Sequence, residues 1–312
     1  MGTLANWQAV DLRDDAVTVR IVGQVSAAAL AQELTGSKAM ARRVMAKGQL
    51  THNGRALEPN ETLAPEETVE LSLCAGKRPA FDAAHMGQPL DIIYQDRVLC
   101  AVDKPRGLLV HGDGSDADTL TARLAASLAA QGMPGTPQTV QRLDVETTGL
   151  VLFSLADELQ PMLDTQVAGH EMVKRYLAVV RGRLPGEDWL ELDGPIARDR
   201  HDARRMRVGR TGKPSLTRVR TLARSGGRSL VLVKLLSGRR HQIRVHLAHA
   251  GHPIVGDALY GDQPAKEGLM LHAYEERLVH PVWRTPLALR TVWPERFSRL
   301  GFDEDVADLR EG

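Results

Sequence analysis

The residues best suited to chemistry lie in two stretches of the chain about a hundred residues apart. Residues 141–154 (QRLDVETTGLVLFS) carry Asp144 in a polar turn that runs into an apolar, strand-like segment. Residues 238–247 (GRRHQIRVHL) place Arg244 in an Arg-rich segment. A cation can keep a carboxylate ionised where water is excluded, and such a carboxylate can act as a nucleophile. The two stretches therefore make Asp144 a candidate nucleophile and the Arg-rich segment a candidate source of a compensating cation.

Other interpretations of Asp144 are open at this point. An Asp in a turn often only shapes the turn, because its side chain accepts hydrogen bonds from nearby backbone amides. Residues 144–147 (DVET) also have a faint similarity to the D-x-D-x-T motif of aspartyl-phosphate hydrolases. The polar residues 141–142 differ from the buried strand that precedes that motif, so we expect no aspartyl-phosphate chemistry.

Histidines are frequent in and after the second stretch and raise the question of a zinc site. Gly251 and Pro253 would break a common helical face. We therefore expect no metal at these positions: His241, His246, His249 and His252.

Taken together, the two stretches resemble motifs of the RluA/RluD type of pseudouridine synthases. QRLDVETTGL resembles that family's H-R-L-D-x-x-T-S-G-L motif, and GRRHQIRVHLAHAGHPIVGDALYG resembles its G-R-x-H-Q-I-R-x-H-L…G-H-P-x-x-G-D-x-x-Y-G segment. Residues 89–111 resemble its opening strand pair, and residues 173–180 resemble its K-x-Y-x-A-x-V segment. The resemblance covers residues 88–297. It implies an isomerase that converts uridine in RNA to pseudouridine without a cofactor. The alternative is a catalytically silent RNA-binding or ribosome-assembly factor with the same fold.

The resemblance also assigns roles to individual residues. Asp144 matches the nucleophile and Arg244 matches the residue that pairs with it. Tyr176 matches the aromatic residue that stacks on the base and is a candidate proton acceptor. Arg142 matches the residue that fills the gap left by the flipped base, and Leu271 matches an apolar wall of the uracil pocket. The residues do not distinguish attack on a base atom from attack on a sugar atom.

Two positions depart from the family motif. Gln141 stands where the family usually has His, and Thr148 stands where it usually has Ser. Thr keeps the hydroxyl, so we expect little effect. Gln keeps hydrogen-bonding capacity but cannot titrate near neutral pH, so activity should survive while substrate choice is more open.

The distribution of charge favours an RNA partner. The net charge of the 312-residue chain is +1, yet residues 198–244 hold fifteen Lys or Arg against two Asp, a local +13, which leaves 1 − 13 = −12 for the remainder. A basic surface of this kind can face a phosphate backbone, although a solvated Arg-rich face would look the same. We expect ribosomal RNA as the target, with tRNA as the alternative.

The composition is typical of a globular protein, with 43% hydrophobic and 25% charged residues. Two cysteines, Cys74 and Cys100, in a chain of this size indicate reduced thiols more than a disulfide. The N-terminus has no signal pattern, and no apolar run approaches the roughly 18 residues that a membrane span needs. We expect a cytoplasmic monomer that makes no contact with a membrane.

Three segments are expected along the chain: a small RNA-binding module at residues 17–75, a linker at 76–88 and the catalytic domain at 89–300. In the module, two helices (27–34 and 37–46) precede an Asn53-Gly54 hairpin and a strand at 68–73. This order is similar to the RNA-binding module of ribosomal small-subunit protein four, although Gln24 and Gly36 begin strings that differ from its usual motifs.

That similarity places four basic side chains on the second helix against phosphates. They are Lys38, Arg42, Arg43 and Lys47. The alternative is a helical cap that packs on the catalytic domain and does not bind RNA.

The catalytic domain should belong to the α+β class, with a central mixed, largely antiparallel sheet. Apolar runs and turn residues predict strands at 91–94, 98–102, 108–110, 150–153, 174–181, 217–222 and 229–236. Helices are expected at 120–130 and 157–168.

Overall fold

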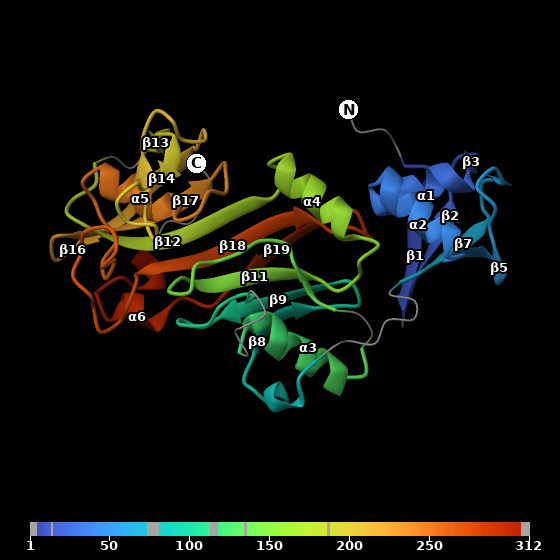
Figure 1. The fold of residues 1–312 in the computed structure, drawn as a ribbon, viewed down its shortest axis with the longest axis horizontal. Helices are drawn as coiled ribbons and strands as arrows, with labels where there is room; N and C mark the ends of the chain where they lie inside the picture. Colours follow the sequence, from blue (N-terminus) through green and yellow to red (C-terminus); the bar gives the residue numbers. More distant parts are fainter. Residues whose placement is uncertain are drawn as a thin grey trace.

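The computed structural model describes residues 5–13, 15–73, 81–112, 118–133, 136–185 and 188–306. It contains a small N-terminal α/β module and a larger part that is built on one long sheet (Figure 1). The module lies at one end of the long sheet, and α5 (Gln242–His249) lies at the other end.

The module consists of a five-stranded sheet, two helices and a short strand pair. The sheet order is β1-β2-β7-β4-β5, and the separate pair is β3 with β6. The bounds are β1 (Trp7–Arg13), β2 (Ala16–Ile21), β3 (Val25–Ser26), α1 (Ala27–Thr35), α2 (Lys38–Ala46), β4 (Leu50–His52), β5 (Arg55–Ala56), β6 (Thr62–Leu63) and β7 (Thr68–Ser72). Because β1 pairs with β2 along its length, this sheet begins ahead of residue 17.

Local sequence signals explain the ends of these elements. Ser26 and Ser37 are the N-caps of α1 and α2, and each side chain accepts a hydrogen bond from the amide three residues on. Asn53 and Gly54 have φ angles of 52° and 76°, the left-handed pair that a two-residue type I′ turn requires. The expected hairpin is therefore present, with β4 and β5 antiparallel on either side of this turn.

The larger part is organised around a ten-stranded sheet with the order β13-β16-β17-β12-β18-β11-β9-β8. In addition, β10 pairs with β11 and β19 pairs with β18. The strands are β8 (Asp91–Gln95), β9 (Leu99–Lys104), β10 (Gln138–Thr139), β11 (Thr148–Ser154), β12 (Val173–Arg181), β13 (Leu190–Leu192), β16 (Thr217–Ser225), β17 (Arg228–Leu235), β18 (Leu271–Val279) and β19 (Pro286–Arg290). The pairing of β11 with β18 is parallel and the other pairings of this sheet are antiparallel, so the predicted mixed, largely antiparallel α+β fold is confirmed.

Helices and one further hairpin complete this part. The hairpin pairs β14 with β15 beside α5. The bounds are β14 (Ile196–Arg198), β15 (Met206–Val208), α3 (Leu120–Ala130), α4 (Gln160–Ala168), α6 (Glu295–Ser298), η1 (Ala83–His85) and η2 (Glu304–Val306). Among the described residues, none of the helices combines the length and the apolar character that crossing a membrane requires.

The strand β11 is buried on both faces, which holds the adjoining Asp144 turn against a rigid element. Side chains alternate along a strand, so Val151 and Phe153 pack with α3 on one face. Leu150 and Leu152 pack with Leu163 of α4 on the opposite face. Figure 1 shows α3 and α4 on opposite sides of the sheet.

Two expected elements differ from the structure. Residues 108–110 do not form a strand, because their backbone carbonyls bond the first turn of α3: Leu120 N donates to Leu109 O and Thr121 N donates to Val110 O. The helix expected at 157–168 begins at Gln160, with a proline in its first turn.

The module and the larger part share one continuous apolar core. Buried residues of α1 and β7 belong to the same cluster as residues of β11 and α4. Gln49 Nε2 donates to Glu158 Oε1 between the two parts at 2.9 Å, and Trp7 stacks with Arg284 at 5.2 Å. The module is therefore packed against the catalytic part. This packing does not distinguish the two interpretations above, because other faces of the module are left for RNA.

Candidate active site

Asp144 and Arg244 come together although they are 100 residues apart in the chain. Arg244 Nη1 donates to Asp144 Oδ2 at 3.2 Å. On its other side, Arg244 makes two bonds of 2.8 Å, from Nε and Nη2, to the carboxylate of the buried Asp257. Burial alone would lower the pKa of Arg244, but the hydrogen bonds and charges of Asp257 and Asp144 raise it above its ordinary value. Arg244 is thus a fixed cation whose orientation is set by Asp257.

His241 approaches the second oxygen of Asp144. Its backbone φ is +55°, a left-handed conformation that is uncommon for a residue with a side chain. Nε2 lies 3.7 Å from Asp144 Oδ1, and Nδ1 lies 2.7 Å from the Tyr260 hydroxyl. That hydroxyl accepts from the Met206 amide, so it can donate its own proton to Nδ1 and leave the ring proton on Nε2, facing Asp144. Burial lowers the pKa of His241, which favours the neutral ring.

Lys104 holds the far side of the Asp144 turn. The side chain is completely buried, and Nζ donates to three carbonyl oxygens, those of Pro105, Leu108 and Val145, at 2.8 to 2.9 Å. Burial lowers the pKa of Lys104 to about 8. The three donors of the ammonium are all used, and the bond to Val145 fixes the residue that follows the nucleophile.

The other residues expected at the site lie on the neighbouring strands or on the turn. Tyr176 on β12 is buried, and burial raises its pKa, as do the charges of Glu276 and Asp144. Leu271, the first residue of β18, is 3% exposed, and Arg142 on the turn is exposed.

The hydroxyl of Thr148, which a Ser at this position would also have, makes two contacts. Its Oγ1 lies 2.7 Å from His272 Nδ1 and accepts from Arg296 Nη2 at 2.6 Å. Nε2 of the same His272 contacts Thr291 at 2.7 Å. Burial lowers the pKa of His272 to about 3, so this ring is neutral and links β11 to β18.

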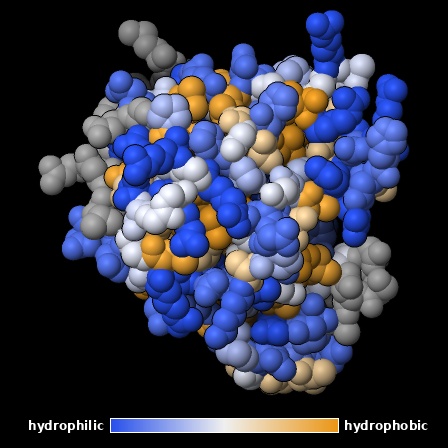
Figure 2. Space-filling view, turned by 90° about the vertical axis from the view of Figure 1, so that its left-hand side faces the viewer, coloured by the Kyte–Doolittle hydropathy of each residue, from blue (hydrophilic) through white to orange (hydrophobic). Residues whose placement is uncertain are grey.

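The basic segment 198–244 reaches the site through the β14–β15 hairpin. The guanidinium of Arg205 lies 5.4 Å from the centre of the Tyr260 ring, and Arg244 lies 5.2 Å from it. Figure 2 looks onto the end of the molecule that bears α5, β14 and β16, where hydrophilic residues cover much of the surface between smaller hydrophobic areas. The segment therefore places the cations of Arg205 and Arg244 beside Tyr260, whose hydroxyl contacts His241.

The module residues lie apart from this site, at the opposite end of the sheet (Figure 1). Lys38 and Arg42 line a pocket of about 460 Å³. Arg43 points to the catalytic part and lies 3.8 Å from Asp157, and Lys47 is exposed at the C-cap of α2.

Metal ligands and cysteines were also considered in the sequence. No cluster of three or more His, Cys, Asp or Glu side chains suited to a metal ion occurs in the described residues. Cys100 is buried and free, and Cys74 lies outside the described residues.

Several important residues were not singled out from the sequence. Asp257 and Tyr260 belong to the quoted string GHPIVGDALYG, so a signal for them was available in the motif. Glu276, which accepts a hydrogen bond from Gln141, had no such signal. Lys104 ends β9, two residues beyond the strand predicted at 98–102, and no role was predicted for it.

Comparisons with known proteins place the chain in a family. A model of the RNA pseudouridylate synthase family matches residues 98–249. The chain is 33% identical over 270 residues to an uncharacterized RNA pseudouridine synthase, YlyB, of Bacillus subtilis, with 85% of this chain and 88% of that protein covered. It is 33% identical over 285 residues to ribosomal large subunit pseudouridine synthase D of Xanthomonas campestris pv. campestris, with 85% and 84% covered.

The fold is also similar to that of solved structures. The human protein named RNA pseudouridylate synthase domain containing 1 superposes with a TM-score of 0.57 and 28% sequence identity, over 68% of this chain and 86% of that chain. Similarity in sequence over most of the chain, together with a carboxylate paired to a buried arginine, leads to one assignment. The chain belongs to the family of RNA pseudouridine synthases, which are isomerases.

Proposed function

We propose that this chain converts uridines of large-subunit ribosomal RNA to pseudouridine, with Asp144 as the nucleophile. The observation that carries the proposal is the contact of Asp144 with Arg244, which Asp257 holds in place from the other side. Ribosomal RNA is the first choice because the Xanthomonas relative is named for the large ribosomal subunit. The basic segment 198–244 supports a polyanionic substrate.

In this proposal the pairing keeps Asp144 ready for attack. A carboxylate in a partly closed site is unfavourable unless a cation compensates for the water that it loses. Arg244 provides that compensation through one nitrogen, Nη1, while its other two nitrogens donate to Asp257. Asp144 therefore keeps oxygen lone pairs with which to attack the substrate.

Tyr176 is assigned to contact with the flipped base. Its ring lies on β12, next to the strand that carries Leu271, so the two side chains supply an aromatic and an apolar surface for a uracil. Burial and two nearby carboxylates favour the neutral phenol. Stacking on the base fits this environment better than proton acceptance by a phenolate.

Arg142 is assigned to the RNA outside the pocket. It is exposed and lies two residues before Asp144. A planar cation at this place can occupy the gap in a base stack and meet a phosphate, which offsets the few kcal/mol that flipping a base costs.

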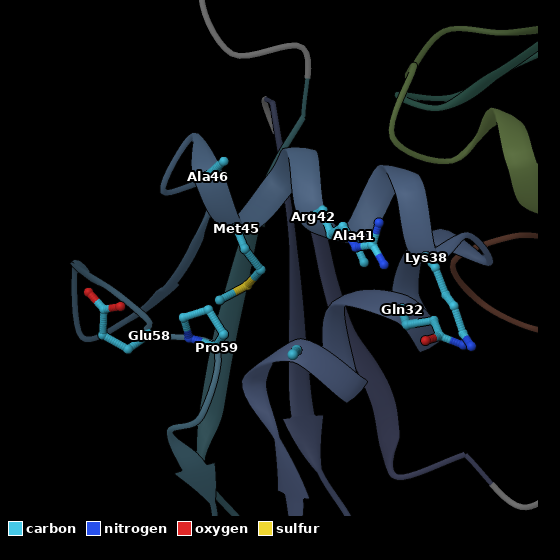
Figure 3. A pocket seen from close by; sticks show the side chains of 9 residues that line it. Gln32, Lys38, Ala41, Arg42, Met45, Ala46, Glu58 and Pro59 are labelled. Atoms are coloured by element: carbon cyan, nitrogen blue, oxygen red, sulfur yellow. The ribbon is translucent and has the colours of Figure 1, made fainter.

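The N-terminal module is proposed as a second RNA contact. Its pocket has apolar residues such as Met45 and Pro59 and the cations Lys38 and Arg42, and Figure 3 shows Met45 pointing toward Pro59. Apolar surface beside cations suits a nucleotide, whose base and phosphate need different partners. Lys47 is available to a phosphate, whereas Arg43 is partly offset by Asp157.

Mapping of pseudouridine at single-nucleotide resolution tests the proposal. Unmodified large-subunit ribosomal RNA and unmodified tRNA would each be incubated with the wild type, with Asp144→Asn and with Asp164→Asn. Asp164 is an exposed Asp on α4 and serves as the matched control. We expect product at defined positions of the ribosomal RNA with the wild type and the control. Asp144→Asn should lower the rate by at least about 10⁴-fold, because the covalent route is removed.

The remaining outcomes separate the alternatives. Product on tRNA alone would replace the substrate and keep the nucleophile. Product that is insensitive to Asp144→Asn would remove Asp144 from its role. Tight binding of both RNAs without product would favour the silent RNA-binding factor.

A further inference from the structure

Glu276 and Gln141 form a buried polar pair directly behind the Asp144 turn. Gln141 Nε2 donates to Glu276 Oε1, and Glu276 is 2% exposed. The remaining side-chain oxygen of each residue, Glu276 Oε2 and Gln141 Oε1, is buried and has no hydrogen-bond partner among the described residues. Both of these atoms are acceptors when Glu276 is ionised, so the charged pair leaves two buried groups unsatisfied.

A proton on Glu276 removes this mismatch. A carboxylic acid has one O–H donor, and an acid next to a primary amide can exchange two hydrogen bonds with it. In that arrangement the acid O–H donates to the amide oxygen while the amide N–H donates to the acid carbonyl. Burial raises the pKa of the Glu276 carboxyl to about 7, against the opposing effects of Lys174 and Gln141.

The cation whose charge acts on Glu276 is Lys174. Lys174 lies opposite Glu276 on β12, and Leu289 lies opposite on β19. Burial lowers the pKa of Lys174, so this residue too is pushed toward its neutral form. The other titratable neighbour is Tyr176, whose pKa is raised by burial and by Glu276.

The pair is connected to the nucleophile through the backbone. Gln141 precedes Asp144 by three residues, and Arg142 lies between them. Lys104 fixes the other end of the turn by its bond to Val145 O at 2.9 Å. Gln141 is therefore the anchor at the near end of the turn, and Glu276 is the residue that holds it.

We propose that Glu276 is a positioning residue of the pseudouridine synthase site, which as a neutral acid pairs with Gln141 and holds the turn that carries Arg142 and Asp144. The proposal rests on the role given to Asp144 above. It follows that the rate of pseudouridine formation should fall at alkaline pH, because loss of the Glu276 proton breaks one hydrogen bond of the pair and loosens the turn.

The first test is the pH dependence of single-turnover pseudouridine formation on unmodified large-subunit ribosomal RNA. Glu276→Gln keeps one donor and one acceptor without a titrating proton, whereas Glu276→Leu removes both. We expect the wild-type rate to fall about tenfold between pH 6.5 and 8.5, and we expect this fall to be absent in Glu276→Gln. Glu276→Leu should be slower by about 10- to 100-fold at every pH, because the position of Asp144 is disturbed.

An alkaline fall of equal size in the wild type and Glu276→Gln would overturn the proposal. A wild-type rate in Glu276→Leu would do the same. Either result would leave Asp144 as the nucleophile, so failure of this inference is distinct from failure of the proposed function.

The second test does not need activity. Hydrogen exchange of a peptide spanning residues 141–147 would be measured by mass spectrometry in the wild type and in Glu276→Gln, and the ratio of the two rates would be taken at each pH. The ratio cancels the intrinsic effect of pH on exchange. We expect the wild type to exchange several-fold faster than the variant above pH 8 and at the same rate at pH 6. A ratio of one at every pH would overturn the proposal even if the enzyme made no product.

Discussion

At the scale of single residues, the sequence motif indicated some of the groups around Asp144 and missed others. The motif indicated Asp144 and Arg244 directly, because both belong to strings with few variable letters. It did not indicate that Asp257 would occupy two donors of Arg244. This sharing of Arg244 depends on the three-dimensional arrangement. Asp144 lies 100 residues before Arg244, and Asp257 follows the helix that carries Arg244.

Glu275 and Glu276 illustrate why some buried charges cannot be foreseen. They are consecutive residues of β18, and alternation in a strand would leave at least one of them on a more open face. Both are 2% exposed. Glu275 is paired with Arg175, Arg277 and Arg290, whereas Glu276 accepts a hydrogen bond from Gln141. The partners of Glu275 lie on other strands or further along the same one, so the local sequence carries no clear sign of them.

His272 should make stability depend on pH. Its pKa is about 3 in the folded protein and about 6.5 when unfolded, so its contribution is present above pH 6.5 and disappears as pH falls toward 3. His272→Gln keeps hydrogen-bonding groups for Thr148 and Thr291 without a proton to gain. We expect the free energy of unfolding of this variant to fall by about 2 kcal/mol less than that of the wild type between pH 6 and 4.5.

Urea denaturation at the two pH values measures this difference. His249→Gln, at an exposed position of α5, is the matched control and should follow the wild type. If His272→Gln showed the wild-type dependence on pH, the buried neutral ring would not be the source of the acid sensitivity.

At the scale of elements, local signals predicted what depends on local interactions. The predicted turn at Asn53-Gly54 joins a hairpin in the structure, and both residues have positive φ angles. The predicted bounds of α3 agree with the structure because an apolar face and the Thr119 N-cap are encoded nearby. The prediction of a strand at residues 108–110 was wrong. The backbone carbonyls of this apolar run accept hydrogen bonds from the first turn of α3, which the run itself does not reveal.

Gly149 is the point at which β11 can meet β18. Its φ is +109°, and a Cβ built there would lie 2.2 Å from Ala273 O. Gly149→Ala should lower the free energy of unfolding by about 3 kcal/mol or more, because the backbone conformation and the approach of the two strands would both be strained. Activity should disappear with it, since Thr148 and the Asp144 turn depend on this strand.

Chemical denaturation and the pseudouridine assay measure the two effects. Gly238→Ala is the control, as nothing lies within 4 Å of a Cβ at that glycine and its φ is not in the left-handed range. An unchanged unfolding midpoint for Gly149→Ala would show that the parallel pairing adapts to a side chain.

At the scale of the whole molecule, the shared core decides how the N-terminal module can be tested. Removal of residues 1–75 would expose the apolar residues of β11 and α4 that the module covers. Weaker RNA binding by such a truncation would then reflect misfolding as well as the missing RNA-binding surface. Substitutions on the free face of α2 avoid this ambiguity.

The double variant Lys38→Gln, Arg42→Gln should bind ribosomal RNA more weakly and with less dependence on salt. Removing one cation from a phosphate lowers the slope of log affinity against log salt concentration by about 0.7 to 0.9, so the slope should fall by about 1.5. Binding titrations at several salt concentrations measure it. Arg55→Gln is the control in the same module, because Glu61 already pairs with that cation.

An unchanged slope for the double variant would remove the module from the RNA interface. The module would then act only as a packed cap, the interpretation that its shared core supports by itself.

The parallel pairing of β11 with β18 also determines when a newly made chain becomes an enzyme. Thr148 and His272 touch across 124 residues of sequence, a length that a ribosome adds in about 6 to 25 s. For most of that interval β11 can pair with β9 and β10, but its Thr148–Gly149 end lacks β18, and Asp144 has neither Arg244 nor Asp257 beside it. The nucleophile is thus synthesised well before the residues that complete its site, so a growing chain cannot modify RNA until Arg244, Asp257 and β18 have been made.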